Sequence, residues 1–195
     1  MIELGAGCGL AGFVTSFLTT NNVYITDGND VVLRLLEKNQ EYIKKSNVMI
    51  HSLRWGLKDA VISFYNKHLD DNSTLHKYKN IIIGADVILW PNEIESLIVT
   101  IKLLLCSNKD SICIISYITR ATKTTELLYD EIKKQNMEIE YIGSDRYLPS
   151  PQPSNLSNLE KNIYIIKSLP SSNDFLSITS DNDRANYIDK NSSSC

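Results

Sequence analysis

The chain has 195 residues, a formal net charge of −3, 43% hydrophobic residues and 22% charged residues, as expected for one globular domain with its own core. The mild negative charge argues against a surface built for nucleic acid or anionic membranes, and no apolar run reaches the roughly 18–20 residues of a membrane span. The four cysteines lack metal-binding spacing, so we expect no metal and a reducing, cytosolic or nuclear setting.

Strand-like and helix-like segments alternate along the chain, which is typical of a mostly parallel sheet covered on both faces. We expect strands at residues 2–4, 23–26, 48–53, 81–86, 111–117, 138–142 and 163–167. We expect helices at residues 10–19, 30–45, 92–105 and 124–135. A polar loop is predicted at 67–79, with a short extended piece before it at 61–65, and a second loop at 148–158. The Ser- and Asn-rich segment 169–195 is predicted to be a disordered tail, which leaves 1–168 as the domain.

Two of these helices carry more specific expectations. In helix 10–19, the apolar stripe by which such a helix packs consists of Leu10, Phe13, Val14, Phe17 and Leu18. Helix 92–105 is expected to start with Asn92 as its cap and Glu95 three residues later.

The most informative stretch is the opening one, where a short strand runs into Glu3-Leu4-Gly5-Ala6-Gly7-Cys8-Gly9-Leu10-Ala11-Gly12. Alternating glycines let the backbone bend sharply and let a ligand approach its N–H groups, and the following helix directs its positive end at that ligand. Asp27 ends the second strand, where a carboxylate accepts hydrogen bonds from ribose hydroxyls. The two features together indicate a site for an adenosine-containing ligand.

Two ligand classes fit this turn. The frame Gly7-x-Gly9-x-x-Gly12 formally matches a dinucleotide turn, so a dinucleotide-dependent oxidoreductase is one interpretation. The complete string, with Glu3 upstream, reads E-x-G-x-G-x-G and favours a ligand without a pyrophosphate.

Four segments occur in order that together resemble a known family: Glu3–Gly12, Thr26–Asn29, Leu53–Gly56 and Gly84–Pro91. From residue 1 to about residue 167 the chain resembles the seven-stranded S-adenosylmethionine-dependent methyltransferases of the calmodulin-lysine methyltransferase group, methyltransferase family 16. The resemblance implies an α/β, Rossmann-like doubly wound sheet of order 3-2-1-4-5-7-6 with the last strand antiparallel. It also implies a protein-lysine N-methyltransferase with a protein substrate.

The resemblance further implies how S-adenosylmethionine binds. The methionine end would be lined by Glu3, Gly5, Ala6, Gly7 and Gly9. The ribose would be held by Asp27, followed by Gly28 and Asn29, and the adenine would be flanked by Leu53, Arg54 and Trp55. Ala85 and Asp86 would close the pocket beneath the sulfonium.

The candidate catalytic residues are Asp86 and Trp90. The family's acid-x-x-aromatic signature falls on Asp86-Val87-Ile88-Leu89, so a leucine stands in the aromatic place and Trp90 follows it. Methyl transfer requires a neutral amine aligned with the donor, and a dry channel lowers the pKa of lysine by desolvation. Asp86 is expected to orient the amine, with Trp90 and Tyr117 as channel walls, and Arg120 is expected to meet an acidic patch on the substrate.

The substrate class also has alternatives. Enzymes that methylate amino groups of nucleic acids usually carry two prolines after strand four, which this chain lacks, so a protein is favoured over nucleic acid, and a small molecule stays open. In the family a segment upstream of the first strand covers the methionine end of the cofactor. We therefore expect an N-terminally truncated domain, with a non-catalytic cofactor-binding domain as an alternative, and a monomer.

Overall fold

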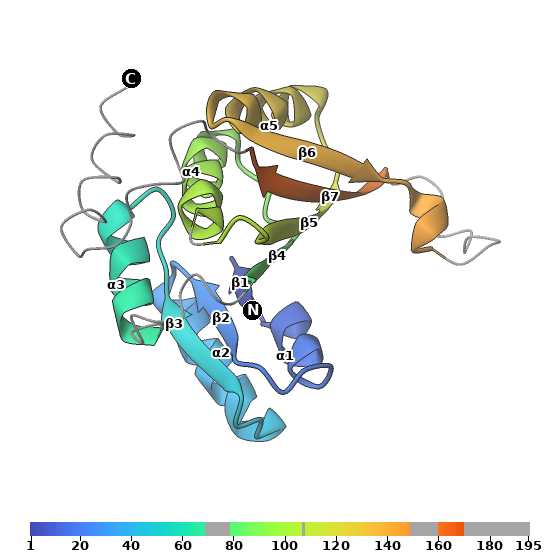
Figure 1. Cartoon of the computed structure of the whole chain (residues 1–195). Helices are drawn as coiled ribbons and strands as arrows, with labels where there is room; N and C mark the ends of the chain where they lie inside the picture. The colour runs from blue at the N-terminus through green and yellow to red at the C-terminus, as the bar shows by residue number, and fades with distance from the viewer. Residues whose placement is uncertain (69–78, 107, 149–159, 170–195) are drawn as a thin grey trace.

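The computed structural model describes residues 1–68, 79–106, 108–148 and 160–169, which form one seven-stranded sheet (Figure 1). The strands are β1 Ile2–Leu4, β2 Val23–Asp27, β3 Val48–Ser52, β4 Ile81–Ala85, β5 Ile112–Ile118, β6 Met137–Ile142 and β7 Lys161–Ser168. Their order is β3-β2-β1-β4-β5-β7-β6, and β7 alone runs antiparallel to its neighbours β5 and β6. The predicted fold class, strand order and antiparallel last strand are confirmed.

Helices cover the two faces of this sheet (Figure 1). They are α1 Leu10–Ser16, α2 Asp30–Ile43, α3 Lys58–His68, α4 Ile94–Leu105 and α5 Thr122–Lys134, with one-turn 3₁₀ helices η1 Pro91–Glu93 and η2 Ser144–Arg146. Side chains of β2 alternate between two buried clusters, as a pleated strand requires: Val23 and Ile25 pack under α1 and α2, and Tyr24 packs under α3 and α4. In the described part of the chain, no helix combines the length and the hydropathy that crossing a membrane requires.

Helix α4 supplies the largest share of the core. Six of its residues form an apolar stripe and are at most 2% exposed: Ile94, Leu97, Ile98, Ile101, Leu104 and Leu105. Burying each such side chain is worth about 1.5–3 kcal/mol. The predicted start is wrong, because the η1 turn precedes α4 and Glu93, not Asn92, is the N-cap residue. Pro91 opens the 3₁₀ turn, which its fixed φ favours.

The segment predicted to be extended at 61–65 is instead part of helix α3. Val61 and Phe64 stand three residues apart, so they share one helical face, and both are buried in the core. The rings of Phe64 and Tyr24 pack in a T-shaped pair, with 5.3 Å between ring centroids. Packing against the sheet therefore overrides the strand preference of these β-branched and aromatic residues.

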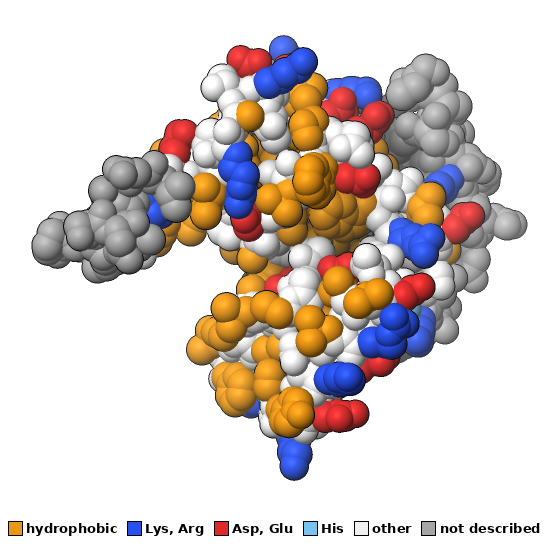
Figure 2. Space-filling model, turned by 180° about the vertical axis from the view of Figure 1, so that it is seen from behind, with side chains coloured by type: hydrophobic (Ala, Val, Ile, Leu, Met, Phe, Trp, Pro, Cys, Tyr) orange, Lys and Arg blue, Asp and Glu red, His pale blue; other side chains and the backbone are white. Residues whose placement is uncertain are grey.

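The apolar stripe predicted for helix 10–19 does not face the core. The helix ends at Ser16, and of the stripe only Phe13 is buried, whereas Leu10 and Leu18 are 70% and 80% exposed. The sheet-facing side is Gly12 and Ser16, because a Cβ at Gly12 would lie 2.7 Å from Ile25. A helix this close to a strand needs small residues at the contact. The larger apolar residues of this segment therefore point away from the sheet, and Figure 2 shows hydrophobic side chains gathered on that surface.

The remaining predicted segments fall largely outside the described residues. These are the polar loop at 67–79, the loop at 148–158 and the tail at 169–195.

Asn47 ties the connection after α1 to the start of β3. Its Nδ2 donates to the carbonyl oxygens of Ser16, Thr19 and Asn21, at 3.3, 2.9 and 3.2 Å. We expect Asn47→Ala to lower the free energy of unfolding by about 1 kcal/mol in a urea titration, since partly exposed carbonyls recover some water. Asn39→Ala is the control, because Asn39 makes one exposed bond to Cys8. An equal loss in both variants would contradict this role of Asn47.

Candidate active site

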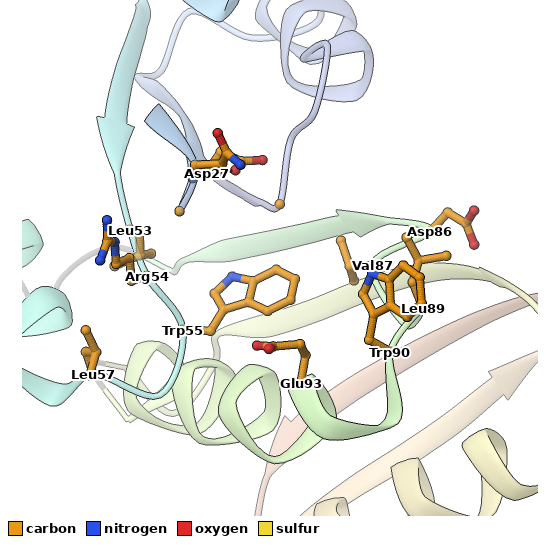
Figure 3. Close-up of a pocket in the computed structure, with 13 residues that line it drawn as sticks. Asp27, Leu53, Arg54, Trp55, Leu57, Asp86, Val87, Leu89, Trp90 and Glu93 are labelled. Carbon is orange, nitrogen blue, oxygen red and sulfur yellow. Dashed lines mark hydrogen bonds between the residues drawn. The ribbon is translucent and has the colours of Figure 1, made fainter. Parts of the chain in front are cut away.

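A pocket of about 690 Å³ opens beyond the carboxyl ends of β1–β4 (Figure 3). This edge is where doubly wound sheets bind their ligands, and the volume is that of a small-molecule site. Its walls come from four segments that follow four different strands: Gly5; Asp27, Gly28 and Asn29; Leu53, Arg54, Trp55 and Leu57; Asp86, Val87, Leu89, Trp90 and Glu93. The structure thus brings together all four segments that the sequence singled out.

The glycine turn is fastened to the end of β2. Its glycines Gly5, Gly7 and Gly9 have φ values of 58°, 55° and 81°, a region that side chains disfavour. The Ala6 N–H donates to the Thr26 carbonyl at 3.0 Å, and the Gly7 N–H donates to Oδ2 of Asp27 at 3.2 Å. The turn is therefore held in place before any ligand arrives.

Asp27 fastens the turn and still has room for a ligand. Its Oδ1 accepts from the Asn29 N–H at 2.9 Å, while its Oδ2 accepts from Gly7. A carboxylate oxygen accepts about two hydrogen bonds, so each oxygen keeps one free acceptor position. The Asn29 side chain caps α2 by accepting from the Val31 N–H at 2.8 Å.

Trp55 lies across the pocket, between the glycine turn and the segment after β4 (Figure 3). Its ring rests on Gly5, where a Cβ would come within 2.8 Å of Cζ2. The indole Nε1 is buried and has no hydrogen-bond partner in the described part of the protein. An unpaired buried N–H costs about 1–3 kcal/mol, which a ligand acceptor would offset. The buried Leu53 links this segment to β2, because its N–H donates to the Asp27 carbonyl at 3.0 Å.

Some predicted cofactor residues support the pocket without lining it. Ala6, Gly7, Gly9 and Ala85 are not among its wall residues. Glu3 is 1% exposed and lies under the turn, where its Oε2 accepts from the Gly12 N–H at 3.0 Å. Burial raises the pKa of Glu3 to about 7; the Gly12 N–H opposes this shift and the charge of Asp27 adds to it.

Asp86 follows β4 in an unusual backbone conformation. Its φ is +56°, which non-glycine residues rarely adopt, and its N–H donates to the Ser116 carbonyl at 2.8 Å. Both of its carboxylate oxygens accept from Arg120, at 2.7 Å from Nη1 and 2.6 Å from Nη2. These hydrogen bonds lower the pKa of Asp86.

The rim beyond Asp86 is apolar. Leu89 and Trp90 are 44% and 66% exposed, and Figure 3 shows them with Asp86 at one end of the pocket. Tyr117, which we expected as a channel wall, is instead buried in the core with its hydroxyl 3.3 Å from the Thr125 hydroxyl.

Sequence reasoning missed several wall residues and one contact. Leu57 and Glu93 line the pocket although they lie outside the motifs, and Val87 lines it although no role was assigned to it within its motif. Figure 3 shows the Glu93 carboxylate directed toward Trp55. Arg120 was expected at the substrate surface, but it pairs with Asp86. Its position two residues after β5, which neighbours β4, is the signal that could have suggested this contact.

Proteins of known identity resemble this chain along most of its length. A calmodulin-lysine N-methyltransferase of Arabidopsis thaliana is 31% identical over 150 residues, which cover 75% of this chain and 45% of that protein. A protein N-terminal and lysine N-methyltransferase, EFM7, of Gibberella zeae is 26% identical over 159 residues, covering 75% and 59%. The chain thus spans about half the length of these relatives.

Solved structures share the fold at low sequence identity. The methyltransferase domain of bacterial CtHen1 superposes with a TM-score of 0.54 at 11% identity, covering 85% of this chain and 88% of that one. The [4+2]-cyclase SpnF gives a TM-score of 0.56 at 10% identity, covering 87% and 74%. Since one fold carries such different reactions, the fold alone does not assign the function.

The family assignment comes from the sequence. A model of the lysine methyltransferase family matches residues 1–135, which contain every residue that lines the pocket. The match covers well over half of the chain, and this chain belongs to the lysine methyltransferase family.

Proposed function

We propose that this protein transfers a methyl group from S-adenosylmethionine to the side chain of a lysine in a protein substrate. The observation that carries the proposal is the pairing, in one pocket, of Asp27 with free acceptor positions and Trp55 with an unpaired indole N–H. These groups fit a nucleoside: a carboxylate for two hydroxyls, and a flat apolar face with one donor for a base. The family assignment supports the same cofactor, and it gives no support to the dinucleotide interpretation.

The residues that would hold the cofactor are those of the pocket wall. Asp27 would accept from the ribose hydroxyls, Trp55 would lie against the adenine, and the turn at Gly5 would border the methionine end. The cofactor supplies an activated methyl group on a sulfonium, so the chain itself has to orient the amine and keep it neutral.

The rim residues have the properties that an incoming lysine needs. Lysine has a pKa of about 10.4 in water, so it arrives as an ammonium ion. The exposed ring of Trp90 can attract that cation, and the apolar surface of Leu89 and Trp90 favours the neutral amine by desolvation. The carboxylate of Asp86 is the acceptor that would orient the amine N–H.

Incubation with methyl-labelled S-adenosylmethionine and a cell extract tests this proposal. We expect label on lysine side chains of one or a few proteins, identified by mass spectrometry, and none with Asp86→Ala, which removes the acceptor for the amine N–H. Binding of S-adenosylhomocysteine by both proteins is measured in parallel, because binding without transfer would indicate a non-catalytic cofactor-binding domain. Label on RNA or on a small molecule would overturn the substrate class, and tighter binding of NAD would overturn the cofactor.

A further inference from the structure

The ion pair between Arg120 and Asp86 differs from the others in the described residues. It is bidentate, with both contacts at 2.7 Å or less, and Nη1 also donates to the Ile118 carbonyl at 3.2 Å. The other ion pairs described are lysine contacts of 3.1–3.4 Å, such as Lys134 with Glu95. Arg120 is therefore fixed at the end of β5 and aimed at one carboxylate at the pocket mouth.

The backbone at Asp86 also indicates a site rather than a surface contact. In the described part of the chain, two other non-glycine residues have positive φ, and both lie just after helices, where this conformation is common. Lys44 directly follows α2, and Asn136 lies two residues after the end of α5. Asp86 follows a strand, where such a conformation is strained and persists only because its surroundings hold it. The bonds to Ser116 and Arg120 are the contacts that hold it.

A bare carboxylate at this position would work against methylation. A negative charge about 4 Å from an amine stabilises the ammonium form, and solvent weakens this effect at an exposed site. A carboxylate that orients the amine therefore also favours the protonated form of that amine, which cannot accept a methyl group. A guanidinium bound to the same carboxylate cancels most of that field but leaves oxygen lone pairs to accept an N–H.

We propose that Arg120 is a positioning residue that holds the Asp86 carboxylate toward the substrate amine and cancels its charge, so that the amine can lose its proton. This inference rests on the proposed function. Other charged or titratable groups lie nearby: Asp27 and Glu93 on the pocket wall, Arg54 at its far end, Tyr117 on β5 and Lys161 opposite Ile118 on β7. Among the residues described, Arg120 alone hydrogen-bonds the Asp86 carboxylate through a side chain, so its removal has the largest effect.

The test is the pH profile of methyl transfer to the protein band that the wild type labels in a cell extract. For Arg120→Gln we expect the rate at pH 7 to fall about tenfold. The part of the pH–rate curve in which the rate rises with pH should shift to higher pH by about one unit. The rates of the two proteins should approach each other above pH 9, and the KM for the labelled protein should stay the same or fall. Arg120→Lys, which restores the charge, should return the rise of the rate with pH toward its wild-type position.

Two controls separate charge from folding. Lys134→Gln also removes a cation from an ion pair, one that joins α5 to Glu95 of α4, and should leave the profile unchanged. Affinity for S-adenosylhomocysteine and the thermal midpoint show whether each variant is folded. A uniform loss at every pH in folded Arg120→Gln would overturn the inference, and so would a profile that Arg120→Lys fails to restore. No transfer by the wild type, with S-adenosylhomocysteine still bound, would overturn the proposed function and this inference with it.

Discussion

Replacing Asp27 by alanine is expected to weaken binding of S-adenosylhomocysteine by about 100-fold or more. Two hydrogen bonds from ribose hydroxyls to a carboxylate are worth about 1.5–3 kcal/mol each, and 1.4 kcal/mol corresponds to a factor of ten. The same change frees the N–H groups of Gly7 and Asn29, so the turn that borders the pocket also loses a support. Calorimetric titration measures the affinity, and a thermal melt shows whether the variant is folded.

Comparison of two ligands separates the ribose contact from the support of the turn. Wild-type protein should bind adenosine more tightly than 2′,3′-dideoxyadenosine, and Asp27→Ala should bind both about equally. Asp59→Ala, which removes an exposed acid from α3, is the matched control and should leave both affinities unchanged. If folded Asp27→Ala still distinguishes the two nucleosides, Asp27 does not contact the ribose.

The parts of the site that could be predicted are those set by local backbone geometry. The turn at Gly5–Gly9 follows from glycine spacing, because positive φ at alternate residues leaves few alternatives. Asp27 follows from its place at the end of β2, since parallel strands bring their carboxyl ends to one edge. The order of the strands in the sheet came from the resemblance to known proteins and not from the local sequence pattern.

The parts that failed depend on what packs where in three dimensions. The apolar periodicity of residues 10–18 predicted a core-facing stripe, but periodicity does not say that Gly12 must face the sheet for close approach. Helix α3 was missed because Val61 and Phe64 show its period over little more than one turn. The pair of Asp86 and Arg120 joins residues 34 apart in sequence, and its bidentate geometry depends on side-chain conformations that no motif encodes.

Glu3 shows how a residue beneath the pocket can reduce the stability of the fold. Its carboxyl is 1% exposed and its pKa is raised from 4.5 to about 7, mainly by burial. The folded protein therefore holds this proton more tightly than the unfolded chain does. Between pH 4.5 and 7 the folded state binds more protons, so its stability falls as the pH rises. One unit of pKa is worth about 1.4 kcal/mol, which makes the loss about 3 kcal/mol at pH 8.

Glu3→Gln should remove this pH-dependent loss. The amide oxygen can still accept from the Gly12 N–H, and the group no longer carries a charge. Urea titrations from pH 4.5 to 8 should therefore show the variant gaining about 2–3 kcal/mol on the wild type as the pH rises. If the buried amide packs less well than the carboxyl, the difference in unfolding free energy between variant and wild type shifts equally at every pH, and its slope against pH stays the same. Glu37→Gln, an exposed change on α2, should give a flat difference within about 0.5 kcal/mol. A flat curve for Glu3→Gln as well would mean that Glu3 is not held in its protonated form by burial.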